Sequence, residues 1–146
     1  MEPLSVAASI IAVIQISGKL VKWCTAYIES VKDAPQDLRI IHVEISTLKA
    51  VFEPLKVLSD NISSFERLHA LQRPIENCRR AVTDLHKLVG FDQHDQDGRQ
   101  DAAPSAKAGT LSSLFWPKKM SRARKLTDEI GRYKTTISLA LTIDTL

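Results

Sequence analysis

The residues of this chain best suited to hold a metal ion or to act as nucleophiles are four histidines and two cysteines. The histidines are His42, His69, His86 and His94. No two of them stand three or four residues apart, so none pair on one helix face at the usual ligand spacing. Cys24 and Cys78 lie far apart and form no C-x-x-C pair. The sequence therefore predicts no metal site and no cofactor.

Nucleophilic catalysis would need a serine or a cysteine beside a positioned base. Cys24 and Cys78 both fall within apolar helical patterns, where a thiol stays protonated and unreactive. His86 could reach Asp84 in the segment TDLHKL, but such pairs are common on helix surfaces. The chain also lacks the phosphate-binding motifs G-x-x-x-x-G-K-S/T and G-x-G-x-x-G. We therefore predict that the protein is not an enzyme.

An acidic segment in the second half of the chain superficially suggests a calcium loop. Its aspartates are Asp92, Asp95, Asp97 and Asp101. Their spacing does not match a calcium-binding loop, and no glutamate stands at the twelfth position to bind in bidentate fashion. The surrounding stretch, 91–113, lacks apolar periodicity and is rich in Asp, Gln, Ala and Ser. It predicts a long flexible loop.

The elements that must position any site are helices, because apolar residues recur at alternating steps of three and four. Four main helices are expected, over about 4–31, 35–58 and 74–89, and from 117 to the C-terminus, with a short piece at 65–71. Gly90 is expected to end the third helix, and Pro54 to kink or end the second. The expected core seam is Leu38, Ile45, Phe52, Ile75, Val82, Leu85, Ile130 and Ile137.

These features predict an all-α fold, a four-helix bundle with a long mobile loop before the last helix. The 146 residues, 44% of them hydrophobic, are enough for one domain with its own core. We expect a single domain over 1–146 that forms the N-terminal part of a longer protein.

The N-terminal helix is unusual because residues 3–18 carry no charge. No basic region precedes this stretch, so it does not read as a signal peptide. From Ile10 to Ile16 its apolar side chains point nearly all round the helix, which requires burial in protein or in lipid. The helix is either the central helix of the bundle or a segment that inserts into a bilayer on activation, and both descriptions can hold in two states. The candidate insertion residues are Leu4, Val6, Ile10, Ile11, Val13 and Ile14.

A basic stretch, KKMSRARK, lies at the start of the last predicted helix. It is either a solvated helix start, balanced by the acidic loop before it, or a surface that attracts anionic lipid. A neighbouring tryptophan suits a membrane interface. The candidate lipid-contacting residues are Trp116, Lys118, Lys119, Arg122 and Lys125. The net charge of +3 is too modest to indicate a nucleic-acid partner.

Segments along the whole chain resemble one known family. They are MEPLSVAASIIAVIQISGKL, KDAPQDLRII, RPIENCRRAVTDLHKLV and LFWPKKMSRARKLTDEIGRYKTTISLALTID. Together they resemble the HeLo-like N-terminal domains of fungal NLR-like STAND proteins, and they are also similar to the N-terminal domain of an azaphilone pigment cluster protein. These motifs are hydrophobic patterns and carry no catalytic signature.

The resemblance implies a cytoplasmic helical bundle that executes or relays a cell-death, heterokaryon-incompatibility or innate-immunity signal. It implies self-association on activation, attack on membranes by the N-terminal helix and recruitment to the plasma membrane. Downstream NACHT and repeat domains in the same chain are expected. The alternative is an adaptor domain that recruits protein partners without touching membranes. Leakage of liposomes separates the two functions.

Overall fold

The computed structural model describes residues 3–30, 36–61, 65–94 and 104–145, and the side chains of 6–29, 36–61, 66–89 and 120–142. Five helices occupy these ranges. They are α1 (Pro3–Ser30), α2 (Gln36–Ser59), α3 (Phe65–Ala70), α4 (Gln72–His94) and α5 (Pro104–Thr145). The described ranges contain no strand. The predicted all-α class is confirmed.

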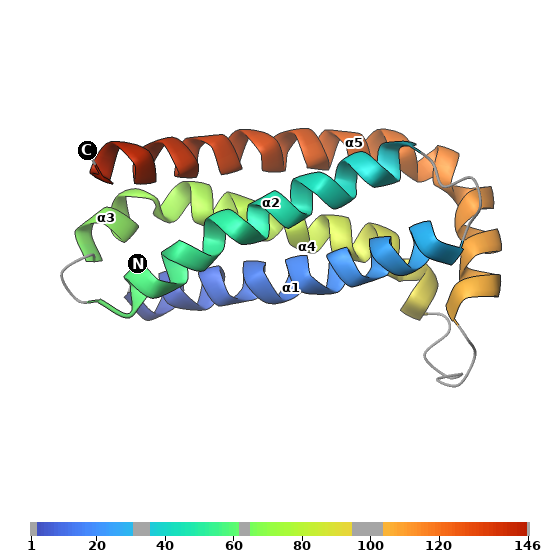
Figure 1. Cartoon of the computed structure of the whole chain (residues 1–146), viewed down its shortest axis with the longest axis horizontal. Coiled ribbons are helices and arrows are strands. Elements are labelled where there is room, and N and C mark those ends of the chain that lie inside the picture. The colour runs from blue at the N-terminus through green and yellow to red at the C-terminus, as the bar shows by residue number, and fades with distance from the viewer. Residues whose placement is uncertain (1–2, 31–35, 62–64, 95–103, 146) are drawn as a thin grey trace.

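The four long helices form a bundle in which consecutive members run in opposite directions, as Figure 1 shows. Helix α1 packs mainly against α2 and α4, and α5 packs against the same two helices. Helices α1 and α5 therefore face each other across the bundle, while α3 covers the end where α2 passes into α4. This is the predicted four-helix bundle.

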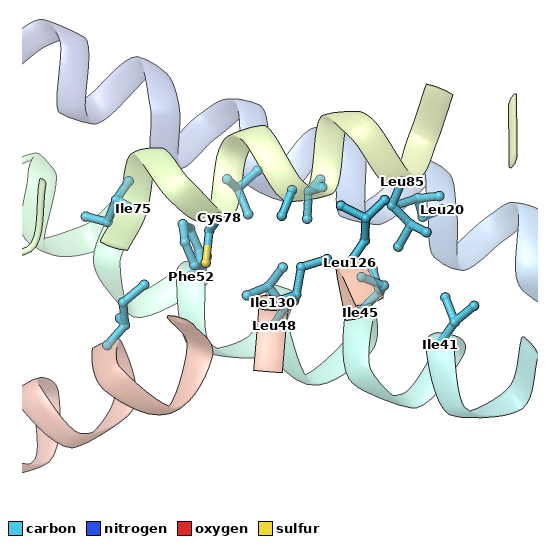
Figure 2. Packing of buried hydrophobic residues seen from close by; sticks show 14 of the residues in the cluster. Leu20, Ile41, Ile45, Leu48, Phe52, Ile75, Cys78, Leu85, Leu126 and Ile130 are labelled. Atoms are coloured by element: carbon cyan, nitrogen blue, oxygen red, sulfur yellow. The ribbon is translucent and has the colours of Figure 1, made fainter. Parts of the chain in front are cut away.

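Alternating three- and four-residue spacing creates the core, because it places one apolar stripe along each helix. Every residue of the predicted seam is at most 1% exposed. Figure 2 shows these stripes pointing into the space between the helices. Cys24 and Cys78 belong to the same core, and burial raises the pKa of each thiol to about 12. Both thiols are therefore inert at neutral pH, as predicted.

Pro54 does not end the second helix, which continues to Ser59. The reason is its position on the outer side of α2, where its side chain is exposed. Proline removes one backbone donor and thereby frees the carbonyl four residues earlier, at Ala50. Ala50 is also exposed, so water can hydrogen-bond that carbonyl. Helix α2 therefore covers nearly the predicted range of 35–58, and Pro54 does not end it.

Helix extends further into 91–113 than the sequence predicted. Helix α4 continues past Gly90 to His94, and α5 begins at Pro104. Proline suits the first turn of a helix, and alanines at 106 and 108 favour its continuation. Figure 1 shows the first turns of α5 steeply inclined to the rest; the helix includes Pro117, and proline is a common cause of such kinks. Residues 95–103 lie outside the described ranges.

Candidate functional site

Helix α1 carries the residues that the sequence singled out for membrane insertion, and the structure divides them between two environments. Val6 is 3% exposed, while Ile10 and Val13 are fully buried. Ile14 is partly buried against the core, whereas Ile11 is 40% exposed. The side chain of Leu4 lies outside the described residues. Half of the predicted insertion set is therefore core in this state of the protein.

The buried face of α1 follows the same alternating steps as the other helices. Its members are Val6, Ile10, Val13, Ser17, Leu20, Cys24 and Tyr27. The opposite face is open to solvent at Ala8, Ile11 and Gln15. Helix α1 thus occupies a corner of the bundle, and the expectation of a central, fully surrounded helix was wrong. A helix with apolar side chains on every face need not be covered by other helices on every face, because single exposed apolar side chains are tolerated on protein surfaces.

The sequence of α1 is apolar enough to cross a membrane by length and composition. The stretch Val6–Glu29 has a mean hydropathy of 1.4, and about a third of its most apolar window is buried in the bundle. A core helix of a water-soluble protein passes the same test. The physical question is therefore how firmly α1 is attached to the bundle.

One polar contact ties the N-terminal half of α1 to α4. Ser9 Oγ donates a hydrogen bond to Glu76 Oε2 over 2.9 Å, and Ser9 is buried. Arg79 also binds the Glu76 carboxylate, donating through Nε over 3.0 Å and through a shorter contact from Nη2. The Arg79 hydrogen bonds and, to a smaller extent, the one from Ser9 lower the pKa of Glu76. We call Ser9, Glu76 and Arg79 the α1–α4 latch.

Other polar interactions also link described residues of α1 to its neighbours. Thr25 Oγ1 lies 3.1 Å from His42 Nε2 and joins the second half of α1 to α2. Lys19 is a charged neighbour of His86 on α4, and the His86 pKa is lowered by burial and then by the Lys19 charge. The sequence offered Asp84 or another neighbour as a partner of His86, and the charged neighbour that lowers its pKa is Lys19.

Acid should loosen the bundle in two steps. The lowered pKa of His86 means that the unfolded chain binds its proton more readily, so stability should fall as the pH drops below about 6.5. The lowered pKa of Glu76 adds stability that is lost as the pH falls below about 4.5. The free energy of unfolding, measured with urea at several pH values, shows both losses of stability. His86→Gln should flatten the decline between pH 7 and 5, and an unchanged profile would contradict the first step.

Ser17 interrupts the buried apolar face of α1. It is fully buried, and within the described part of the chain its Oγ has no hydrogen-bond partner. A buried hydroxyl without a partner costs free energy, so Ser17→Ala should raise the free energy of unfolding by about 1 kcal/mol. Ser138→Ala on the exposed side of α5 is the control for the helix preference of alanine. Equal gains at both sites would show that burial of the Ser17 hydroxyl carries no penalty.

The predicted lipid-contacting residues lie in the N-terminal half of α5. Arg122 and Lys125 are exposed, while the side chains of Trp116, Lys118 and Lys119 lie outside the described residues. Figure 1 places the first turns of α1 at one end of the bundle and this part of α5 at the opposite end. The two predicted membrane elements are therefore not brought together in the bundle.

Sequence reasoning did not find the contacts that join α5 to α2. Lys134 Nζ lies 2.6 Å from Glu44 Oε1 and donates to Thr47 Oγ1 over 3.0 Å. Arg124 lies 3.6 Å from Asp37, so one member of the basic stretch is used within the bundle. These pairs join residues far apart in the chain, and no local pattern indicates them.

The described residues include no cluster of three or more histidine, cysteine, aspartate or glutamate side chains that could hold a metal ion. The geometry therefore defines a helical-bundle domain whose notable feature is an apolar corner helix fastened by a small polar latch. The chain belongs to the family described as pigment biosynthesis cluster protein PigL N-terminal, which it matches over residues 1–146. This family agrees with the resemblance to a pigment cluster protein. No curated protein and no solved structure matched the chain significantly.

Proposed function

We propose that this domain is a non-enzymatic signalling or cell-death effector of a fungal NLR-like receptor, acting by self-association and by insertion of α1 into a membrane. The observation that carries the proposal is the position of α1. Helix α1, which contains a 24-residue stretch with a mean hydropathy of 1.4, lies at a corner of the bundle, where it can leave without passing through other helices.

The length of the uncharged part of α1 indicates how it would act. Residues 3–18 carry no charge, and 16 helical residues measure about 24 Å. The hydrocarbon core of a bilayer is about 30 Å thick, so this part falls short of spanning it alone. Lys19 and Lys22 follow at once and would stay at the head groups. We therefore propose insertion from one side rather than a stable transmembrane helix.

Release of α1 from a single copy would be unfavourable, because it uncovers the buried faces of α1 and of the three helices left behind. Contact with lipid would offset the cost of exposing the buried face of α1, and self-association on activation would cover the exposed faces of the remaining helices. The proposal thus couples oligomerisation to insertion. It implies a cytoplasmic protein that moves to the plasma membrane when activated, with NACHT and repeat domains further along the same chain.

Leakage of a dye from vesicles tests the proposal. Oligomers of the domain should permeabilise vesicles containing anionic lipid at low salt, and less so as salt rises, because charge attraction is screened beyond about 8 Å at physiological ionic strength. The variant Arg122→Gln/Lys125→Gln should bind such vesicles more weakly. The control Lys56→Gln/Lys87→Gln removes the same charge from exposed positions on other helices and should bind like the wild type.

The alternative function is an adaptor that recruits proteins and leaves membranes intact. One observation favours it: Ile40 and Val43 on α2 are 49% and 60% exposed, which offers an apolar surface without any movement of α1. An adaptor should leave vesicles intact at every salt concentration. That result, obtained with oligomers, would replace the membrane proposal by the adaptor.

A further inference from the structure

Helix α2 carries a second stripe at alternating three- and four-residue steps, on the side opposite the core. Its seven members are Gln36, Ile40, Val43, Thr47, Ala50, Pro54 and Val57. All are exposed and none is charged. Ile40, Val43 and Val57 are 49%, 60% and 70% exposed. We call these seven residues the outer stripe of α2.

The outer stripe contributes little to the bundle, since among its members only Thr47 has a hydrogen bond to another helix described above, from Lys134 of α5. The inner face of α2 already supplies six buried residues to the core, from Leu38 to Leu55. Figure 1 shows α2 on the near side of the bundle, crossing in front of α4. A regular apolar spacing on a solvent-facing side is the pattern by which one helix packs against another, so the stripe is suited to an additional helix.

The charges beside the stripe indicate which helix that is. Arg39 and Glu53 flank it on the same side, and both are exposed. Arg39 stands seven residues before Ser46, and Glu53 stands seven residues after it. A second α2 packed in the opposite direction about Ser46 would bring Arg39 of each copy to Glu53 of the other. Such self-complementarity is the property of a two-fold interface.

The sizes of the stripe residues agree with the same register. In an antiparallel pair centred on Ser46, Ile40 of one copy lies between the levels of Ala50 and Pro54 of the second copy, and Val43 lies between the levels of Thr47 and Ala50. Each larger side chain thus meets a smaller one, which allows the two helices to interlock closely. The antiparallel arrangement also places the opposite ends of the two helix dipoles beside each other.

We propose that the outer stripe of α2 is the surface through which a second copy of this chain binds, with the two α2 helices antiparallel and centred near Ser46. The inference rests on the proposed function, because it names the surface used for the self-association stated there. The stripe is only about 30 Å long, and a single helix pair is small beside a standard stable interface. The dimer is therefore weak and forms at high local concentration.

Charge reversal tests the pairing of Arg39 with Glu53. Sedimentation equilibrium over a range of concentrations gives the dissociation constant of the dimer. Arg39→Glu alone and Glu53→Arg alone should each weaken dimerisation about tenfold, since each places two like-charged contacts across the interface. The double variant Arg39→Glu/Glu53→Arg restores opposite charges at both contacts and should recover the wild-type constant. Failure of the double variant to recover would overturn the antiparallel register.

Cross-linking tests the position of the two-fold axis. Cys24 and Cys78 are buried with raised pKa values, so an introduced surface cysteine is the reactive one. Two Thr47→Cys residues would lie offset by about 3 Å along the helix axes, and two Val57→Cys residues by about 33 Å. A short thiol cross-linker should therefore join Thr47→Cys copies and leave Val57→Cys copies separate. Equal cross-linking at both positions would indicate parallel helices and overturn the proposal.

A last pair of variants separates the stripe from apolar exposure in general. Val43→Lys should abolish dimerisation without loss of helical content, because the side chain it replaces is 60% exposed. Leu139→Lys on α5, at a side chain 58% exposed, should leave the dimer unchanged. All these measurements are made without lipid, so the absence of vesicle leakage would count against membrane action alone. A wild-type chain that stays monomeric at millimolar concentration would overturn the dimer alone.

Discussion

Replacing Leu85 by alanine is expected to lower the free energy of unfolding by about 2–5 kcal/mol. Leu85 is fully buried on α4, and Figure 2 shows it pointing into the interior toward which Leu20 of α1 and Ile45 of α2 also point. Truncation removes apolar contacts with more than one helix and leaves a cavity that the rigid helices cannot fully close. Urea denaturation followed by circular dichroism measures the change.

Leu139 provides the matched control for Leu85. It is 58% exposed on α5, so Leu139→Ala should change the free energy of unfolding by no more than about 0.5 kcal/mol. The contrast between two leucines on helices of one bundle isolates burial from side-chain type. A Leu85→Ala protein as stable as the control would mean that the core is not packed around α4 as described.

The core was predictable because its signal is local and repeated. Spacing along α2 is enough to select the six residues from Leu38 to Leu55, and all six are buried. The same rule finds Ile75, Val82 and Leu85 on α4. A helix has a fixed period, so a stripe in the sequence becomes a face in space whatever the neighbouring helix is.

The surroundings of α1 were harder to predict for the same physical reason. The apolar side chains of its residues 10–16 point nearly all round the helix, so periodicity could not select the face that packs inward. The structure selects Ile10 and Val13 and leaves Ile11 exposed. The sequence did not predict the outer stripe of α2 for a similar reason: the inner stripe alone accounts for the apolar periodicity of the helix.

Contacts between residues far apart in the chain could not be predicted from the sequence. Ser9 and Glu76 are 67 positions apart, and Glu44 of α2 forms an ion pair with Lys134 of α5. Their side chains are common types with no distinctive spacing, so only the fold brings them together. The predicted helix boundaries around 91–113 were wrong for another reason: the polar composition predicts a loop, whereas Gln, Ala, Lys and Asp can also form exposed helix.

Fastening α1 to α4 is expected to remove nearly all vesicle leakage, if leakage requires α1 to leave the bundle as proposed. Ser9 Oγ lies 2.9 Å from Glu76 Oε2, and the Glu76 side chain is 19% exposed. A short cross-linker can therefore attach first to a cysteine at position 76 and then reach a cysteine at position 9 beside it. The buried native thiols, with pKa values of about 12, should not compete. The same double variant without the cross-linker should leak at least as fast as the wild type, since it lacks the latch. Mass spectrometry confirms the link before leakage is measured.

The control fastens two helices other than α1. Glu44 and Lys134 join α2 to α5 over 2.6 Å, and cysteines at these positions accept the same cross-linker. Proteins linked at this second site should still leak, because α1 remains free to leave. A covalent link at the latch prevents α1 from separating from α4, whereas in the native latch a single hydrogen bond, from Ser9 to Glu76, joins the two helices and contributes about 1–3 kcal/mol. Leakage that survives the α1–α4 link would show that α1 stays in the bundle and would exclude it as the inserting helix.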